Sequence, residues 1–403
     1  MNVFAAGLLA SSLALSALVP QGRPAASERP ADTLTVRPLS SSTADLQWTA
    51  PTGAARFDVL RDGRLLDSVP ASGGTGYQDH LLWASTAYTY DVKVFDAGGA
   101  MLEDLAAGTT TPAQTGSFPR LYASTSFWNT PIATRPAVDP DSAAIVAASL
   151  GSYRSVATFN DSDAWGIPIA YANPSSTRYE VHCTLFDCSL PVSFRIPRYA
   201  QPDTQTDGHL VVIDPSQPGS TELDMWRGVY DPLADSWTDG SRYVNDAFGW
   251  GANCALGAHC GGAVAAGFSV AGGIVRPEEI AQGHIDHALV VGAPFTRSKV
   301  IACPGTNAWV TGGFDDPTAI PLGARIQLNP TFDVGAQSWP DWQKTIARAL
   351  QTYGAYVADN AGSLEVRAEA NLDRGYDAWA KVGIPSHWPG TPSLAALPWS
   401  KFR

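Results

Sequence analysis

Short strand-like runs separated by turn residues dominate the chain between residues 33 and 330. Examples are "WGIPIAYA", "RYEVHCTL", "GHLVVIDP", "TELDMWRGVYD", "HALVVGAP" and "ARIQLNP". β-Branched and aromatic residues favour strands, and the Gly, Pro, Asn and Asp residues between the runs favour turns. Short strands at this spacing are typical of sandwiches and jelly rolls. The sequence therefore predicts a mainly β fold with a few peripheral helices.

Two segments predict helices instead. Residues 139–152, "DPDSAAIVAASLGS", suggest a short helix with an aspartate near its start and Gly151 at its end. Residues 338–362, "SWPDWQKTIARALQTYGAYVADNAG", predict one longer helix with Gly362 near its C-terminal end. Its apolar positions share one face, and they are Trp342, Ile346, Leu350, Tyr353 and Val357.

Length and composition indicate a secreted protein of two domains. The chain has 403 residues, 45% hydrophobic and 16% charged, with 13 Trp, 37 Gly and 30 Pro. Residues 1–27 contain an apolar run followed by a polar, Pro-rich stretch, which resembles a secretory signal peptide, and a membrane anchor is the alternative. No later segment has 18 uninterrupted apolar residues, so we expect no membrane contact after signal cleavage, and a monomer.

The net charge disfavours some classes of ligand, and the cysteine spacings indicate the cellular compartment. The net charge of −12 and the absence of a Lys/Arg run argue against nucleic acid and disfavour a polyanionic substrate. Cys183–Cys188 and Cys254–Cys260 have spacings that suit small disulfide-closed loops in an oxidising compartment. Neither spacing matches a zinc site, and Cys303 is left over as a candidate buried thiol.

Residues 32–112 form a pattern of their own. "TADLQWTAP" alternates into Trp48, and Asp62-Gly63 is a strong hairpin turn signal between two strand-like runs. In "TAYTYDVKVFDAGG", Tyr88 and Tyr90 share one strand face with two valines. This segment resembles a fibronectin type III module, in which Trp48 is the core tryptophan and Tyr88 the tyrosine corner. The resemblance implies a spacer or binding accessory without chemistry.

The sequence predicts a linker at residues 113–120. It predicts a jelly-roll-like catalytic domain at residues 121–403. Within it, "ELDMW" resembles the Glu-x-Asp strand motifs of jelly-roll glycoside hydrolases. The strings "DGHLVVIDP", "GGIVRPEEI" and "GHIDHALVV" also resemble a family of secreted bacterial β-proteins, glycan-active but of uncertain function. That second resemblance supports one coherent fold and assigns no reaction.

Residues 208–228 predict a hairpin with one polar face. A symmetric register places Val211 opposite Asp224 and Ile213 opposite Glu222, with Leu210, Val212, Leu223 and Met225 forming the core face. The other face carries His209, Glu222, Asp224 and Trp226, and we expect it to be accessible. Carboxylates and a histidine there provide acid–base groups, and an indole stacks on a sugar ring. A solvated face with an ordinary salt bridge is the alternative.

The spacing of the two carboxylates bears on their roles. Residues two apart on a strand have Cα atoms roughly 6.5–7 Å apart, and their side chains point the same way. A glycosidase pair flanks the bond from opposite walls, roughly 5–5.5 or 6.5–9.5 Å apart. Glu222 is therefore expected to work with a partner from another strand, and Asp224 to assist.

Three further segments supply candidate partners. The Gly-rich loop closed by Cys254–Cys260 carries His259, which could lie over a cleft or face water. Arg276 precedes a short helix that starts at Pro277, and it could clamp a carboxylate or be structural. In "GHIDHALVVG", read as a strand, His284 and Asp286 share a face, and His287 is either an acid–base residue or a core histidine.

No phosphate-loop, dinucleotide or HExxH motif is present, so no organic cofactor is expected. A metal on His209, Glu222, His259 and His287 has suitable ligand types, but the spacing does not require one, and we predict none.

The sequence thus favours a secreted enzyme acting on polysaccharide, first as a glycoside hydrolase. In that hypothesis Glu222, Asp224, His209 and His287 are catalytic, and the substrate is bound by Trp226, Arg227, His259, Arg276 and Asp286. A polysaccharide lyase with a His base and an Arg neutraliser is the second hypothesis, and a non-catalytic glycan-binding protein is the third. The polysaccharide, its linkage and the endo or exo mode are not indicated.

Overall fold

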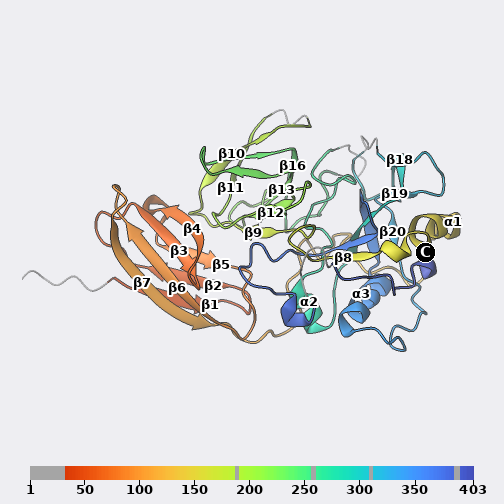
Figure 1. Cartoon of the computed structure of the whole chain (residues 1–403), viewed down its shortest axis with the longest axis horizontal. Helices are drawn as coiled ribbons and strands as arrows, with labels where there is room; N and C mark the ends of the chain where they lie inside the picture. Colours follow the sequence, from red (N-terminus) through yellow and green to blue (C-terminus); the bar gives the residue numbers. More distant parts are fainter. Residues whose placement is uncertain (1–31, 187–189, 256–259, 308–311, 385–390) are drawn as a thin grey trace, which may run out of the picture. The chain divides into compact units, whose positions relative to one another are not determined.

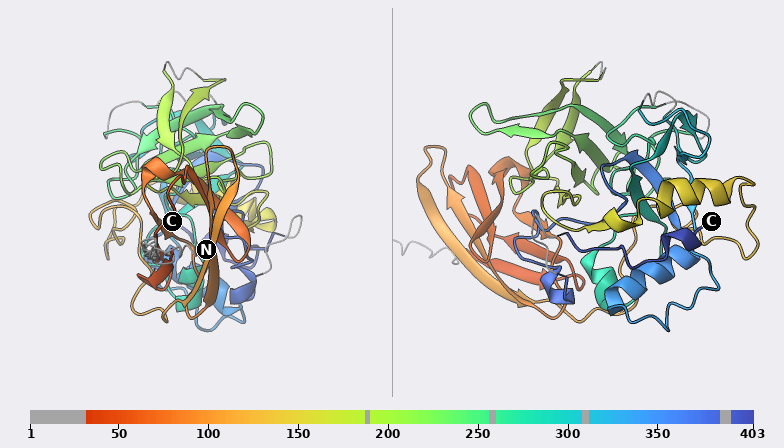
Figure 2. Two further views of the ribbon diagram at one scale, coloured as in Figure 1. Left: turned by 90° about the vertical axis from the view of Figure 1, so that its left-hand side faces the viewer. Right: turned by 45° about the vertical axis from the view of Figure 1, so that its right-hand side comes forward.

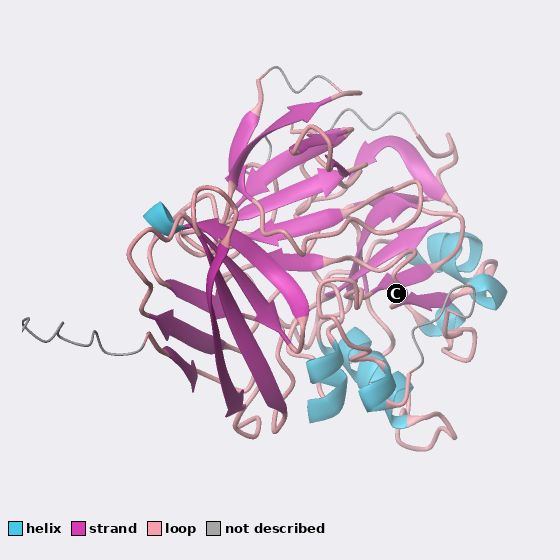
Figure 3. Ribbon diagram, turned by 60° about the vertical axis from the view of Figure 1, so that its left-hand side comes forward, coloured by secondary structure: helices cyan, strands magenta, loops and turns pink. Residues whose placement is uncertain are grey.

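The computed structural model describes residues 32–186, 190–255, 260–307, 312–384 and 391–403. The expected signal peptide, residues 1–27, therefore lies outside the described residues. Strands dominate the regular structure and helices are few, which confirms the mainly β prediction (Figure 3). Residues 32–403 cluster as one compact unit, and the boundary expected at residues 113–120 stays a prediction.

Residues 34–110 form two antiparallel sheets. One has the order β1 (Leu34–Pro38), β2 (Ala44–Trp48) and β5 (Gly76–Asp79). The other has the order β4 (Arg64–Pro70), β3 (Arg56–Arg61), β6 (Ala87–Phe95) and β7 (Met101–Thr110). Figures 1 and 2 show this second sheet, in orange, as strands running side by side.

The details expected of this part are confirmed. Trp48 is 4% exposed in the core and packs edge-on against Phe57. The hydroxyl oxygen of Tyr88 accepts a hydrogen bond from the backbone N–H of Trp83 (2.7 Å), as in a tyrosine corner. Asp62 and Gly63 both have positive φ (49° and 77°) in the turn between β3 and β4, which is the conformation a two-residue hairpin turn needs.

The remaining strands form mixed sheets. One has the order β11 (Val192–Arg195), β10 (Arg178–Cys183), β15 (Ser236–Asp239) and β14 (Val229–Asp231). A second has the order β16 (Ser241–Asn245), β13 (Glu222–Trp226), β12 (Leu210–Ile213) and β9 (Ile169–Tyr171).

A third sheet has the order β20 (Arg325–Ile326), β21 (Ala355–Asn360), β17 (Leu289–Ala293), β22 (Glu365–Arg367) and β8 (Thr158–Asn160), and β18 (Thr296–Ile301) pairs with β19 (Ile320–Leu322). Several neighbouring strands are parallel, among them β9 with β12 and β17 with β21. These pairs distinguish the arrangement from the antiparallel sheets of a jelly roll.

Three α-helices accompany these sheets in the described residues: α1 (Ser142–Val146), α2 (Pro277–Gln282) and α3 (Asp341–Thr352). The single helix expected over residues 338–362 is wrong in its second half. Gly354 has φ +69° and lies just beyond the helix end, and the chain continues as β21, which pairs in parallel with β17. Ile346 and Leu350 are fully buried, so the apolar face expected for the first half is confirmed.

The hairpin β12–β13 has the expected register. Val211 pairs with Asp224 and Ile213 with Glu222. The predicted core face is also buried as one set: Leu210, Val212, Leu223 and Met225, all at 0% exposure. The accessibility expected of the opposite face is wrong, because Val211 and Ile213 on that face belong to a second buried cluster. Both faces of this hairpin are therefore covered.

Candidate active site

Glu222 and Asp224 lie side by side in the interior, at 0% and 1% exposure. The Tyr122 hydroxyl donates to Glu222 Oε1 (3.0 Å), and Asn245 Nδ2 donates to Asp224 Oδ2 (2.8 Å). The other two oxygens, Glu222 Oε2 and Asp224 Oδ1, have no hydrogen bond of ordinary geometry among the described residues. The backbone N–H groups of Ala271 and Val270 are nevertheless close enough to lower the pKa values of Glu222 and Asp224, respectively. One proton shared between the carboxyls satisfies both oxygens.

The pKa values of this pair follow from that environment. Burial, and then the neighbouring charge of Asp224, raise the pKa of Glu222 well above its usual range. Burial also raises the pKa of Asp224 to about 6, although hydrogen bonds from Glu222 and Asn245 oppose it. The pair therefore retains a proton near neutral pH, as expected of two coupled carboxyls.

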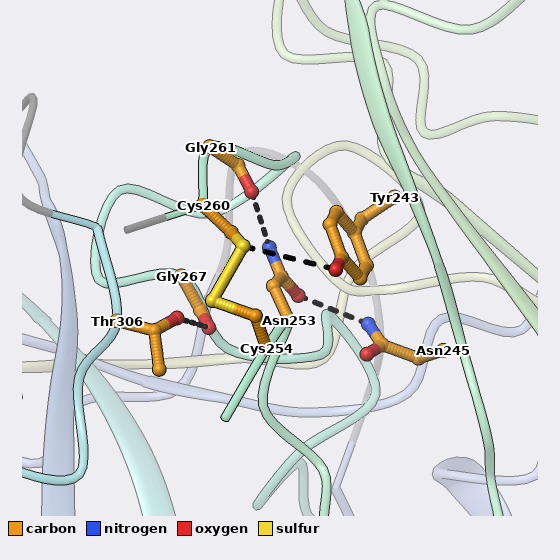
Figure 4. Close-up of a disulfide and its surroundings, with 8 residues drawn as sticks. All are labelled: Tyr243, Asn245, Asn253, Cys254, Cys260, Gly261, Gly267 and Thr306. Carbon is orange, nitrogen blue, oxygen red and sulfur yellow. Dashed lines mark hydrogen bonds between the residues drawn. A yellow bond between two sulfur atoms is a disulfide. The ribbon is translucent and has the colours of Figure 1, made fainter. Parts of the chain in front are cut away.

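A disulfide lies close to Asn245, the residue that donates to Asp224 (Figure 4). Cys254 and Cys260 are bonded, as predicted. Asn253, next to that loop, donates through Nδ2 to the carbonyl oxygen of Gly261 (2.8 Å) and accepts through Oδ1 from Asn245 Nδ2 (3.0 Å). Because the same Asn245 amide donates to Asp224, the loop helps to hold the position of that carboxyl.

His209 lines a cavity that Glu222 and Asp224 do not line. Its backbone N–H donates to Asp203 Oδ2 (2.6 Å), and its ring Nδ1 lies 3.7 Å from the same oxygen. His209 Nε2 has no hydrogen-bond partner among the described residues. The cavity beside it measures about 330 Å³, and its chemically active lining residues are Trp165, Asp203, Asp207, His209, Glu365 and Arg367.

The carboxylates of this cavity differ in how firmly they are held. Asp203 accepts the backbone N–H groups of His209 and Gln205. Glu365 accepts from Arg367 (3.1 Å) and from Asn160 (2.7 Å). The Asp207 side chain is half-buried, and among the described residues its carboxylate accepts a hydrogen bond from Trp226 Nε1 at 3.3 Å. Asp207 is thus the carboxylate with the most freedom to meet a ligand.

Trp226 and Arg227 lie beside the cavity rather than in its wall. The Arg227 guanidinium stacks over the Trp226 ring at 4.5 Å, and Phe186 packs on the same indole. Trp165 lines the cavity and Trp226 does not, and the sugar-stacking role of Trp226 stays a prediction.

His287 and Arg276 belong to a separate buried network. His287 Nε2 lies 2.8 Å from Glu279 Oε1, and Arg276 Nε lies 2.9 Å from Glu369 Oε2. Burial lowers the pKa of His287, but the charge and hydrogen bond of Glu279 outweigh it, so the pKa of His287 is raised. The adjacent cavity, lined by Tyr122, Arg276, Glu279 and His287 among others, measures about 20 Å³, which is room for about one water molecule.

The other expected site residues are dispersed. Asp286 is partly exposed and lies 3.4 Å from His284 Nε2. The strand expected to carry both residues on one face begins only at Leu289, so that part of the prediction is wrong. His259 lies outside the described residues, as does Cys188, while Cys183 is disulfide-bonded. Cys303 is exposed and free, contrary to the expectation of burial. No group of ligand-type side chains in the described chain could hold a metal ion.

Several residues of this region were not anticipated from the sequence. Asp203 and Asp207 come within six residues of His209, so their spacing could have indicated them. Trp165, Glu365 and Arg367 come from distant segments and carry no local signal.

The chain matches no protein-family model. It is 33% identical over 147 residues to an alpha-amylase of Niallia circulans, a match that covers 34% of this chain and 11% of that protein. It thus spans about a tenth of the length of that curated relative.

Similar solved structures include fibronectin type III domains. The fn3 domain of human collagen alpha-1(XX) chain is 22% identical, with 24% of this chain and 98% of that chain covered and a TM-score of 0.20. The fibronectin(III)-like modules of Clostridium thermocellum CbhA are 18% identical, covering 20% of this chain and 98% of theirs at a TM-score of 0.17. A Yersinia enterocolitica family 28 exopolygalacturonase is 19% identical, covering 20% of each chain at a TM-score of 0.19. Separately, none of the helices in the described residues is long and apolar enough to cross a membrane.

Proposed function

We propose that this chain is a secreted carbohydrate-active enzyme that hydrolyses glycosidic bonds in a polysaccharide. The observation that carries the proposal is the cavity in which His209, Asp207 and Trp165 meet. An acid–base pair beside an indole is what a sugar-cleaving site needs. The partial sequence match to a protein named as an alpha-amylase supports the same substrate class.

The roles follow from the contacts. His209 protonates the glycosidic oxygen as the bond to the anomeric carbon breaks, and Asp207 takes a proton from the water that attacks that carbon. Asp203 orients the His209 ring from 3.7 Å, and Trp165 stacks on the sugar. Glu222 and Asp224, first expected to touch substrate, have no step in this proposal, because both are buried and line none of the cavities described above.

A lyase reaction is the second candidate, because Arg367 lines the same cavity as His209. In that reaction His209 removes the proton next to a uronic carboxylate and the glycosidic oxygen leaves with the bonding electrons. Arg367 already forms ion pairs with Glu365 (3.1 Å) and Asp359 (3.2 Å). These two carboxylates neutralise its charge, so it is poorly suited to bind the carboxylate of a uronate. This pairing favours hydrolysis.

Digestion of a glycan panel tests the proposal, with reducing ends and ultraviolet absorbance read in parallel. Hydrolysis releases reducing ends without an unsaturated product, and a lyase produces both. Polymers left intact by the wild-type chain would overturn both enzyme assignments and leave glycan binding. The matched variants are His209→Ala and Asp207→Asn, with Gln205→Ala as the control in the same loop.

A further inference from the structure

We propose that the hairpin formed by β3 and β4 positions His209, because it holds the segment 197–203, whose last residue carries the carboxylate next to that histidine. The proposal rests on the proposed function, since it gives residues 34–110 a part in the reaction that His209 serves. The sequence resemblance implied a spacer for this part of the chain. The contacts of the hairpin indicate instead that it supports the site.

β4 is an edge strand of its sheet, and the segment 197–203 covers part of that edge. The backbone N–H of Tyr199 donates to the carbonyl oxygen of Leu66 on β4 (3.1 Å). Both residues are buried, and they belong to the same hydrophobic cluster as the core face of β12–β13. An uncovered edge strand leaves backbone groups unpaired, so this contact satisfies groups of the edge and fixes the segment against it.

Asp67 of β4 fastens the same segment through its carboxylate. Its Oδ1 accepts the backbone N–H of Arg198 (3.2 Å), and its Oδ2 accepts the hydroxyl of Ser176 (2.6 Å). Asp67 is fully buried, and burial raises its pKa to about 6, although these hydrogen bonds oppose the shift. Burying a carboxyl is unfavourable unless its hydrogen bonds are made. The donors that this side chain meets, rather than its packing, therefore explain an aspartate at this position.

A second attachment of the segment 197–203 also depends on this hairpin. The backbone N–H of Gln201 donates to Asp373 Oδ1 (3.0 Å). The two carbonyl oxygens that flank Asp373 accept hydrogen bonds from guanidinium groups of the hairpin, one from Arg64 (2.8 Å) and one from Arg61. The hairpin thus holds the segment directly through Asp67 and indirectly through the backbone around Asp373.

The segment ends at Asp203, which holds His209 at three points. Asp203 Oδ2 accepts the backbone N–H of His209 (2.6 Å), and the backbone N–H of Asp203 donates to the His209 carbonyl oxygen (2.9 Å). The ring Nδ1 of His209 lies 3.7 Å from the same Oδ2. A shift of the segment would therefore move the backbone and the ring of His209 together. Displacing a reacting group by about 1 Å can lower a rate about 10²-fold, so this support matters for catalysis.

Amide hydrogen exchange of the full chain, measured without substrate, tests the attachment. Asp67→Ala removes the acceptor of the Arg198 N–H. The amides of residues 198–203 and of His209 should then exchange about tenfold faster or more, as expected for the loss of a hydrogen bond to a charged group. Asp67→Asn keeps an oxygen for that N–H, so its exchange should match that of the wild type. Asp104→Ala, at an exposed position of β7, is the control.

A second pair of variants keeps the test open if Asp67→Ala does not fold. The backbone N–H of Ala200 donates to the Pro197 carbonyl oxygen (3.1 Å), which makes Arg198 the second residue of a tight turn, a position that favours proline. Arg198→Pro therefore removes the N–H that Asp67 accepts and keeps the turn, whereas Arg198→Ala retains that N–H. Both variants lack the guanidinium group, so its loss does not separate them. Faster exchange of the remaining amides is expected in the proline variant alone.

Turnover gives the second readout. Asp67 does not line the cavity beside His209, so Asp67→Ala should lower kcat about 10- to 100-fold with little change in KM, and Asp67→Asn should restore it. Unchanged exchange at these amides in both Asp67→Ala and Arg198→Pro, or equally faster exchange throughout the chain, would overturn the proposal. Faster local exchange with full turnover would refute the positioning role and leave the hydrolase. If the wild type cleaved no glycan, the proposed function would fall, and the exchange data would still decide whether the hairpin holds His209.

Discussion

Glu222 and Asp224 stand two residues apart on β13, and one oxygen of each buried carboxyl has no hydrogen-bond partner among the residues that the structure describes. Two carboxylates cannot both ionise at such close range in a buried place without a large cost, so the pair keeps a proton. The protonation of this buried pair therefore affects how the stability of the fold depends on pH.

The first prediction concerns the pH dependence of stability. The unfolded carboxyls lose their protons near pH 4, whereas the folded pKa of Asp224 is raised to about 6 and that of Glu222 higher. The folded chain therefore binds more protons above about pH 4, and this pair's contribution to the free energy of unfolding falls as the pH rises through that window.

Glu222→Gln should remove this slope, because an amide donates to Asp224 Oδ1 without titrating. The variant should gain up to about 1.4 kcal/mol over the wild type for each pH unit of the window. Urea unfolding at pH 5 and pH 8 measures the difference, with the exposed Glu180→Gln as the control. If the free energies of unfolding of Glu222→Gln and the wild type changed equally between pH 5 and pH 8, the shared proton would be refuted.

The second prediction concerns turnover. His209→Ala should lower kcat/KM on the cleaved polysaccharide about 10²–10⁴-fold, since it removes an acid–base group at the cavity wall. Gln205→Ala, whose side chain does not line that cavity, should cleave at the wild-type rate. Full activity of His209→Ala would exclude the assigned role.

The third prediction concerns the buried ion network. Glu369 accepts from Arg276 and from Arg374 at 2.9 Å, and all three residues are at most 6% exposed. Burial raises the pKa of Glu369, but the two guanidinium groups outweigh it, so the pKa is lowered.

Glu369→Gln would leave two buried cations with too little compensation, and we expect a loss of about 3–5 kcal/mol of folding free energy. Denaturant unfolding at neutral pH measures it, against the same Glu180→Gln control. A loss no larger than that of the control would show that the network is not a source of stability.

The fourth prediction concerns the disulfide. Cys254 and Cys260 close a short loop, and joining such a loop stabilises a chain by roughly 2 kcal/mol through the unfolded state. The double variant Cys254→Ala/Cys260→Ala should lose about this amount. Cys303→Ser, at an exposed free thiol, should not change stability. Equal melting temperatures for all three proteins would contradict the prediction.

Some features of this chain follow from local sequence. The register of β12–β13 follows from β13, in which Leu223 and Met225 alternate with Glu222 and Asp224, because a one-residue slip would place the carboxylates opposite the core positions of β12. The β3–β4 turn follows from Asp62-Gly63, which tolerates positive φ. These preferences act between residues close in the chain, so the sequence by itself determined them.

Other features were decided by residues far apart in the chain. Alternation separates two faces of a strand but does not state which face meets water, so the burial of Glu222 depended on Tyr122 and the core around Val211. The second half of the expected helix became β21 because β17 offered a parallel partner beyond Gly354. The cavity beside His209 likewise combines segments near residues 165, 207 and 365. Only tertiary packing brings residues so far apart in the chain into contact. Burial from water and pairing between distant strands depend on those contacts, so a short stretch of sequence does not predict them.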